Sequence, residues 1–365
     1  MAWLISLVVL GLLVLVHELG HFLVARWSGV RVTRFSIGFG PVLFRWQRGG
    51  TEYAVSLLPL GGYVNMAGEH HHEQVHAPWE FLSQPPGIRA RIVAAGPLVN
   101  YLVSVVSLWT VLVIGYPELL PTVGRLIEDM PAKAAGIQVG DRIVAVDGQP
   151  IHTWDELTRA IHRSPNRPLT MQLDRGGSAL TIPVTPAARE LPDPVGRPRR
   201  VGLVGMAPSG AFTLYHVAPL EAIPKTATKQ LEWTSQMVLS LWSLVSGRVS
   251  MQESPLTGPI GIIYMTSEAV RMGLGALLYL VSFLSLSLAV FNLFPIPILD
   301  GSHLLYLGLE KLRGRPISVQ VQEKAAQIGF AAFALLMVFV CVSDVNRFGV
   351  LEWFRRLASR LLPHD

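Results

Sequence analysis

The sequence has little charge and a single cysteine. Of its 365 residues, 15% are Asp, Glu, Lys or Arg and 50% are hydrophobic, and the mean hydropathy is positive. This balance excludes an ordinary soluble enzyme of this length and is typical of a membrane protein. Because Cys341 is the only cysteine, no intramolecular disulfide can form, and cysteine usage does not identify the compartment.

Charge is also missing locally. Residues 92–114, 274–299 and 325–343 contain no Asp, Glu, Lys or Arg, and each is close to the ~20 helical residues that cross a bilayer. Residues 2–25 form a fourth, nearly uncharged run, which lacks the basic start and the cleavage site of a signal peptide. We therefore expect four transmembrane helices, with both termini on the same side of the membrane.

The formal charge of +5 follows this topology and gives no reason to expect nucleic-acid binding. Seven arginines lie between residues 26 and 91, and further basic residues lie between 311 and 324. Under the positive-inside rule both segments are cytoplasmic, which places the termini and residues 115–273 outside. Four arginines in the tail after the last run argue against this orientation.

The segments between the apolar runs differ in character. Residues 26–91 alternate apolar positions with Gly-Gly pairs, which predicts hairpins that partly enter the membrane. Residues 117–186 have the composition of a small soluble domain, with a helix that Thr153 and Glu156 can cap. Residues 219–271 contain two apolar-periodic pieces, which are typical of amphipathic helices at a membrane surface.

Two histidines and a glutamate interrupt the first apolar run. In HELGH, His17 and His21 are four residues apart, so on a helix they share a face and can bind one metal ion, with Glu18 placed as a general base. Ionisable groups in a transmembrane helix cost on the order of 2–3 kcal/mol each and are by default functional or paired. Alternatively, the histidines bond to neighbouring helices and Glu18 reaches the membrane surface.

A third ligand is predicted at the end of the third run, in FNLFPIPILDGSH. Zinc held by two histidines needs one more protein ligand, and Asp300 follows this run at the membrane face where the first run also ends. Pro295 and Pro297 break the helix there, which is tolerated only beside protein or a watery cavity. Asn292 can donate to a substrate carbonyl. The alternatives are a helix cap for Asp300 and a helix–helix contact for Asn292.

These motifs resemble the site-2 protease family of intramembrane zinc metalloproteases, in particular its bacterial RseP-type members. The resemblance rests on five segments in the family's order: HELGH (17–21), PLGGYVNMAGE (59–69), RARIVAAGPLVN (89–100), PLTGPIGI (255–262) and NLFPIPILDG (292–301). It implies Zn2+ bound by His17, His21 and Asp300, with Glu18 as base and Asn292 holding substrate.

The resemblance also implies how substrate is held. The strand-like piece that contains Gly61, Gly62, Tyr63 and Val64 would pair with the substrate's main chain, because close backbone approach explains the two glycines. Residues 131–151 resemble part of a PDZ domain, of which this chain has one where well-known members carry two.

The implied fold is a multi-pass α-helical membrane protein with a membrane-associated β-hairpin region and one extracytoplasmic PDZ-like α+β domain. Its expected segments are transmembrane helices at 1–25, 92–115, 274–299 and 325–343, a reentrant β region at 26–91, the PDZ-like domain at 117–187, a linker with interfacial helices at 188–273, a cytoplasmic loop at 300–324 and an amphipathic tail at 344–365.

The implied function is regulated intramembrane proteolysis in the bacterial inner membrane, as part of a stress response. The implied substrates are single-pass membrane proteins such as anti-sigma factors, already shortened by another protease, and signal-peptide remnants. The alternatives are a metal-ion transporter or sensor that uses the same ligands, and an inactive PDZ scaffold. The histidines at 70–76 invite a second metal site, but a solvated loop is the ordinary explanation.

Overall fold

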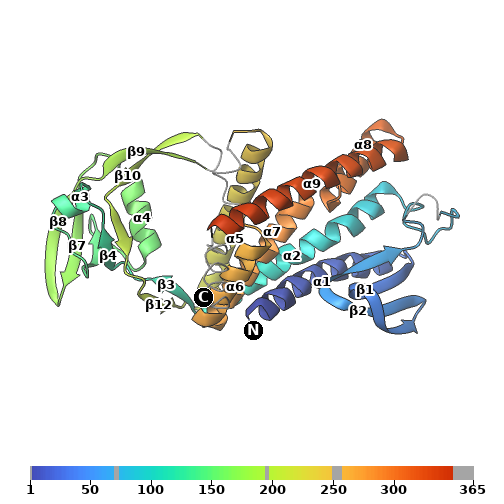
Figure 1. Cartoon of the computed structure of the whole chain (residues 1–365), viewed down its shortest axis with the longest axis horizontal. Helices are drawn as coiled ribbons and strands as arrows, with labels where there is room; N and C mark the ends of the chain where they lie inside the picture. Colours follow the sequence, from blue (N-terminus) through green and yellow to red (C-terminus); the bar gives the residue numbers. More distant parts are fainter. Residues whose placement is uncertain (1, 70–73, 194–196, 249–256, 348–365) are drawn as a thin grey trace, which may run out of the picture. The chain divides into compact units, whose positions relative to one another are not determined.

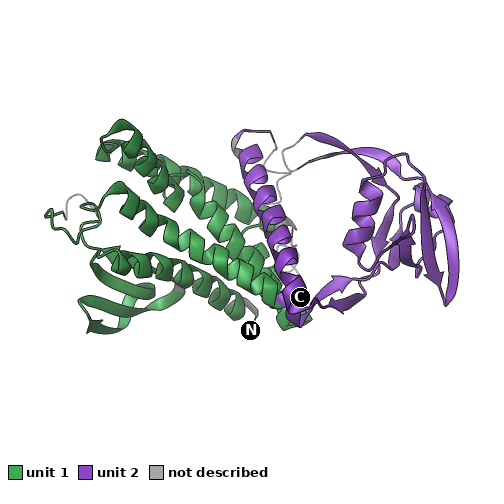
Figure 2. Ribbon diagram, turned by 180° about the vertical axis from the view of Figure 1, so that it is seen from behind, with its two compact units in different colours: residues 1–110, 255–365 green, residues 111–254 purple. Residues whose placement is uncertain are grey.

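The computed structural model describes residues 2–69, 74–193, 197–248 and 257–347. The chain divides into two compact units (Figure 2). The first contains Met1–Thr110 and Pro255–Asp365, and the second contains Val111–Ser254. The chain therefore leaves the first unit, forms the second, and returns.

Within the described residues, four helices are long and apolar enough to cross a membrane. They are α1 (Ala2–Trp27), α2 (Pro86–Ile114), α7 (Leu274–Leu293) and α9 (Val319–Arg347), and they lie side by side (Figure 1). Together with the β-rich segments they fit the multi-pass membrane architecture expected from the sequence.

Several helix ends differ from the ends of the uncharged runs. α2 and α9 begin several residues before residues 92 and 325, because a helix can continue with charged side chains beyond the apolar stretch. α7 ends at Leu293 rather than at 299, since Pro295 and Pro297 lack the N–H that a continuing helix needs. The expected loop at 300–324 is mostly a helix, α8 (Asp300–Arg313), which Gly314 ends in a left-handed conformation.

Small residues hold the apolar helices close together. The Ser104 hydroxyl on α2 donates to the Ser282 carbonyl on α7 at 2.7 Å, and the Ser285 hydroxyl on α7 donates to the Asn100 carbonyl on α2 at 2.8 Å. Gly20 on α1 packs directly against the backbone of Ala95 on α2. Such contacts substitute for hydrophobic burial, which does not drive helix association in lipid.

A short helix, α6 (Pro259–Met272), contacts α1, α7 and α9. Its first turn is capped from α9, because the Asp344 carboxylate accepts a 2.8 Å hydrogen bond from the Gly261 N–H. Asp344 is only 1% exposed. This buried acid is therefore stabilised by the unpaired N–H groups and the positive end of a helix dipole.

β1 (Val32–Arg48) and β2 (Thr51–Met66) form a hairpin in which one part of β1 pairs with two separate parts of β2. Phe35 lies opposite Val64 on one side and opposite Tyr53 on the other, so both long strands must bend. At one bend Gly38 has a φ of +86°, and a side chain there would overlap the Leu58 carbonyl. The bends place residues 62–66 at an edge of the sheet, where β2 contacts α1.

The second unit is rich in β-structure. Its elements are β3 (Tyr116–Leu119), β4 (Val123–Leu126), α3 (Pro131–Ala134), β5 (Arg142–Val146), β6 (Gln149–Pro150), α4 (Trp154–His162), β7 (Leu169–Arg175), β8 (Ser178–Val184), β9 (Ala187–Pro192), β10 (Pro198–Leu203), β11 (Met206–Pro208), β12 (Phe212–Tyr215) and α5 (Pro219–Val245). An antiparallel sheet has the order β6-β5-β7-β8, and its fully buried core includes Ile143, Leu157, Met171 and Leu173.

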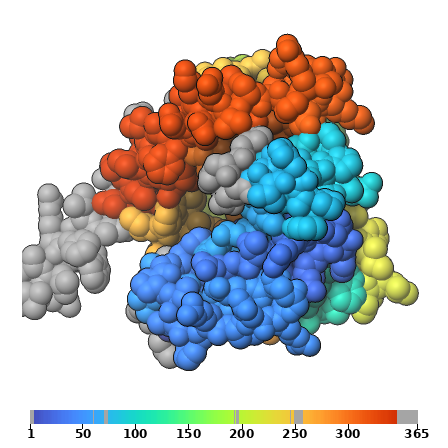
Figure 3. All heavy atoms as spheres, turned by 90° about the vertical axis from the view of Figure 1, so that its right-hand side faces the viewer, coloured from blue at the N-terminus to red at the C-terminus, as the bar shows by residue number. Residues whose placement is uncertain are grey.

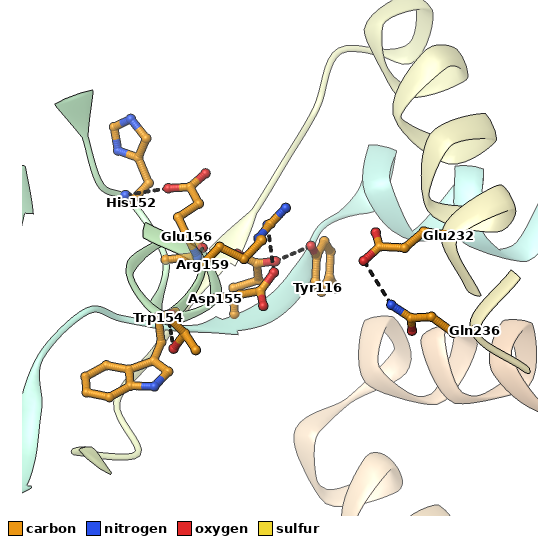
Figure 4. A network of polar contacts seen from close by, with 11 residues as sticks. Tyr116, His152, Trp154, Asp155, Glu156, Arg159, Glu232 and Gln236 are labelled. Atoms are coloured by element: carbon orange, nitrogen blue, oxygen red, sulfur yellow. Dashed lines mark hydrogen bonds and ion pairs between the residues drawn. The ribbon is translucent and has the colours of Figure 1, made fainter. Parts of the chain in front are cut away.

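The predicted cap of α4 is confirmed (Figure 4). The Thr153 hydroxyl accepts from the Glu156 N–H, and the Glu156 carboxylate accepts from the His152 N–H. The first bond satisfies an N–H group that a helix start leaves unpaired, and the second ties the residue before the cap to the first turn. The spacing of Thr153 and Glu156 in the sequence was sufficient to locate the first turn of this helix.

The segment expected as a linker from residue 188 contains strands. β9 pairs with β10, while β11 and β12 pair with β4 and β3 at the beginning of the unit. The first and last strands of the unit therefore pair, and its strands extend to Tyr215 rather than to 187. Proline and glycine between short strands gave this segment the composition of a linker. A PDZ-like fold for this unit stays a prediction.

Candidate active site

The two histidines of HELGH point to one spot beside α2. They are one helical turn apart on α1 and are 6% and 8% exposed. The Nε2 atoms of His17 and His21 lie 3.2 Å apart, and the rings meet edge to face at a centroid distance of 4.8 Å. Gly96 makes room for them, because a Cβ at this position of α2 would overlap both rings.

Asp300 reaches the same spot from the first turn of α8. Its Oδ2 lies 3.0 Å from His17 Nε2 and 3.5 Å from His21 Nε2. The turn before it is tight: Ile298 has a φ of +90°, and a Cβ at Gly301 would overlap the carbonyl groups that end α7. The glycine after Asp300 therefore allows the carboxylate to face α1.

The three converging atoms fit a cation. The Nδ1 of His21 lies 2.8 Å from the Ile92 carbonyl, so this nitrogen carries the proton and Nε2 presents a lone pair. Asp300 Oδ2 is buried and accepts no hydrogen bond, although it lies within ion-pair distance of both rings. Two imidazole nitrogens and a carboxylate oxygen, all within 4.8 Å of one another, are a donor set that zinc prefers, and they leave a coordination position open.

Glu18 lies beside these residues at a cavity of about 670 Å³. Residues of α1, β2, α2, α8 and α9 line this cavity, together with the segments that precede α2 and α8. Figure 3 shows the first unit from the side on which β1 and β2, in blue, and α8 and α9, in orange to red, lie. The backbone of Val64 on β2 is hydrogen-bonded to the Glu18 carboxylate. The cavity therefore reaches the Glu18 carboxylate, which lies next to the three side chains that could hold a metal ion.

The residues predicted to bind substrate are not all at the cavity. Val64 lines it. A Cβ at Gly61 would overlap Val14 of α1, and a Cβ at Gly62 would overlap the Ser36 carbonyl of β1. The Tyr63 ring stacks on Phe39, with ring centroids 5.9 Å apart. Asn292 lies in the last turn of α7 and is not among the residues that line the cavity.

The remaining histidines and the C-terminal tail are described only in part. His303, three residues after Asp300 on α8, is exposed and lines the cavity. Residues 70–73 of the histidine cluster and residues 348–365 of the expected tail lie outside the described residues.

α2 contributes contacts to both histidines that were not predicted from the sequence. Ile92, Gly96 and Asn100 follow one another at intervals of four residues and therefore face α1 from one side of the helix. The Ile92 carbonyl is hydrogen-bonded to His21, Gly96 packs against both histidine rings, and the Asn100 side chain contacts His17. The signal was present in AAGPLVN, where a glycine and an asparagine share a face of an apolar helix.

Comparison with known proteins identifies the family of this chain. A model of peptidase family M50 matches residues 5–337. A protein of Rhizobium meliloti (strain 1021), provisionally named a zinc metalloprotease, is 37% identical over 358 residues, which cover 93% of this chain and 95% of that protein. Regulator of sigma-E protease RseP of Escherichia coli (strain K12) is 30% identical over 448 residues, covering 93% and 97%. Zinc metalloprotease RasP of Geobacillus kaustophilus (strain HTA426) is 29% identical over 420 residues, covering 94% and 97%.

Proposed function

This chain belongs to peptidase family M50 and is a zinc metalloprotease, and we propose that it cleaves a peptide bond within the membrane-spanning segment of other proteins. The observation that carries this proposal is the position of the site. His17, Glu18 and His21 lie in an apolar helix long enough to cross a membrane, and Asp300 meets them from α8. A protease that worked only on soluble substrates would not need its ligands at that depth.

We assign the ligands and the base as follows. His17, His21 and Asp300 hold Zn2+, which when bound polarises the scissile carbonyl and favours ionisation of the attacking water. Glu18 takes the proton that this water loses and delivers it to the nitrogen of the leaving amine. The elements of water are thereby added across the C–N bond. The hydrogen bond with the Val64 backbone holds the Glu18 carboxylate toward the cavity.

Substrate is proposed to bind as a strand along residues 62–66 of β2. A helical segment must unwind before a protease can attack it, because its carbonyl groups are bonded within the helix. Two observations support this part: residues 62–66 pair on one side only among the described strands, and Val64 lines the cavity. Main-chain pairing with the backbone groups of this edge that Glu18 does not occupy would hold an extended substrate beside Glu18. Asn292 is proposed to assist from α7.

The proposed substrates are single-pass membrane proteins such as anti-sigma factors, along with signal-peptide remnants. Relatives named regulators of sigma-E protease support the first class. The proposed location is the bacterial inner membrane, with the termini and the second unit outside. There the second unit would act as a PDZ-like filter that admits substrates another protease has already shortened.

The test compares the wild type with Glu18→Gln. Both proteins are purified in detergent, assayed for zinc per chain, and incubated with single-pass membrane proteins that have short extracellular parts. Glu268→Gln, the same chemical change at the surface pair with Arg271, serves as control. We expect near-stoichiometric zinc in all three proteins and a loss of about 10²–10⁴ in cleavage rate for Glu18→Gln alone.

Other outcomes of this test separate the alternatives. Zinc in every variant without cleavage by any would favour the transporter or sensor. Equal cleavage by the wild type and Glu18→Gln would remove Glu18 from the mechanism.

A further inference from the structure

Asn100 is a buried polar side chain that the proposed reaction does not use. It lies on α2 with 0% exposure, in the uncharged part of that helix. Its side-chain amide faces His17, at 3.4 Å between Asn100 Nδ2 and His17 Nδ1. A buried amide in a transmembrane helix is costly unless it is paired, so this contact needs a reason.

The hydrogens at this contact can be assigned from the chemistry of His17. Its Nε2 points at Asp300 Oδ2, so a metal bound there takes the Nε2 lone pair and Nδ1 must carry the proton. An N–H at Nδ1 requires an acceptor. An amide NH2 cannot accept, so with Nδ2 toward the ring two donors would face each other.

The other atom of the amide resolves this conflict. Asn100 Oδ1 is buried and has no hydrogen-bond partner among the residues that the structure describes. The oxygen and nitrogen of an amide have nearly the same shape, so their assignment follows from the hydrogen-bond network. Exchanging them places Oδ1 at the His17 N–H, so that the ring N–H and the amide oxygen bond to each other, and Nδ2 takes the position for which the described part of the chain offers no partner. At 3.4 Å the pair is a few tenths of an ångström longer than an ordinary N–H···O bond, which a small approach would close.

We propose that Asn100 is a positioning residue for the metal centre: its Oδ1 accepts the His17 Nδ1–H and thereby fixes the ring with Nε2 toward the metal. This inference rests on the proposed ligand set. Histidine ligands commonly donate their other N–H to an oxygen, and losing that oxygen weakens metal binding about 10–100-fold. His21 already has such an oxygen, the Ile92 carbonyl of the same helix.

The position of Asn100 is itself fixed. The Ser285 hydroxyl on α7 donates to the backbone carbonyl of Asn100 at 2.8 Å. One helical turn further along α2, the Ser104 hydroxyl donates to the Ser282 carbonyl. α2 therefore presents two acceptors, the Ile92 carbonyl and the Asn100 side chain, at the height of the two histidines. In this arrangement α2 orients both rings before a metal arrives.

The experiment measures zinc affinity of the purified full chain in detergent by competition with a chromophoric chelator. Asn100→Leu has a similar volume but no acceptor, and we expect its affinity to fall about 10–100-fold. Asn100→Asp keeps an oxygen at the same place, and its affinity should equal or exceed that of the wild type. Ser104→Ala, which removes a buried α2–α7 bond without touching a histidine, should bind zinc as the wild type does. Asn100→Ala replaces Asn100→Leu if the latter does not fold.

The inference is overturned if Asn100→Leu or Asn100→Ala binds zinc as tightly as the wild type. It is also overturned if Asn100→Asp is weakened as much as the acceptor-free variants, or if Ser104→Ala loses as much affinity. His17→Ala is titrated alongside to separate the two claims. Unchanged affinity in His17→Ala would refute the ligand set. Lost affinity there, with unchanged affinity in Asn100→Leu, would refute only the role of Asn100.

Discussion

The substitution Gly96→Ala tests whether the packing of α2 against α1 forms the metal centre. The new methyl group would lie 2.8 Å from His17 Cε1 and closer still to His21 Nε2. Ordinary carbon contacts begin near 3.4 Å, so the His17 ring must move by about 0.6 Å, because packed interiors have no slack to absorb the difference. Metal–ligand distances tolerate only about 0.2 Å, so the displaced rings should no longer converge.

The expected effect on stability is smaller than the effect on zinc. Overpacking costs about 1–3 kcal/mol, while replacing glycine by alanine within a helix recovers about 1 kcal/mol. We therefore expect a net loss of at most about 2 kcal/mol in the free energy of unfolding, but at least a tenfold loss of zinc affinity and the loss of proteolysis.

The assay compares zinc retained after dialysis against a chelator with the midpoint of thermal unfolding in detergent. Gly87→Ala is the matched control, because it makes the same change in the same helix where no atom lies within 4 Å of the added Cβ. This control should keep its zinc and be as stable as the wild type or slightly more so. A Gly96→Ala protein that retains zinc and activity would refute the reasoning.

Four further predictions follow from described contacts. Arg89→Met should destabilise the protein by about 3 kcal/mol, since it leaves the mostly buried Glu310 unpaired at α8, and a double-mutant cycle in thermal unfolding should show coupling between the two positions. Burial opposes ionisation of Asp141, but bonds from Arg175 and the Gln138 amide hold its pKa below the usual 3.8. The second unit should therefore lose stability as the pH falls below about 4. Hydrogen-exchange protection factors in β5, which correct for the intrinsic exchange rate at each pH, should be higher at neutral pH than below about 4, and Asp141→Asn should abolish this difference. Asp344→Asn should cost about 1 kcal/mol by weakening the cap of α6, measured by thermal unfolding. Chelation of zinc should stop proteolysis, and added Zn2+ should restore it.

The metal-binding groups could be predicted from the sequence because local rules determine them. The i, i+4 spacing places His17 and His21 on one face of any helix, and the apolar run around them predicts that helix. Asp300 needed one more step, that two parallel crossings end at the same face of the membrane. The structure brings these three side chains together as expected.

The surroundings of the site could not be predicted in the same way. The double pairing of β1 depends on bends at residues such as Gly38, and the sequence shows the glycines but not which segments they bring together. The contact between Asn100 and His17 joins residues 83 positions apart. Likewise, pairing of β12 with β3 closes the second unit through long-range contacts that composition does not record.

The most direct test of the central claim is to locate the cut and identify its oxygen. A single-pass membrane protein is incubated with the wild type and with Glu18→Gln in water enriched in oxygen-18, and the products are analysed by mass spectrometry. The account predicts a cut inside the membrane-spanning segment, made by the wild type and not by Glu18→Gln, with one heavy oxygen in the new C-terminal carboxylate. A cut outside that segment, or an equal cut by Glu18→Gln, would contradict it.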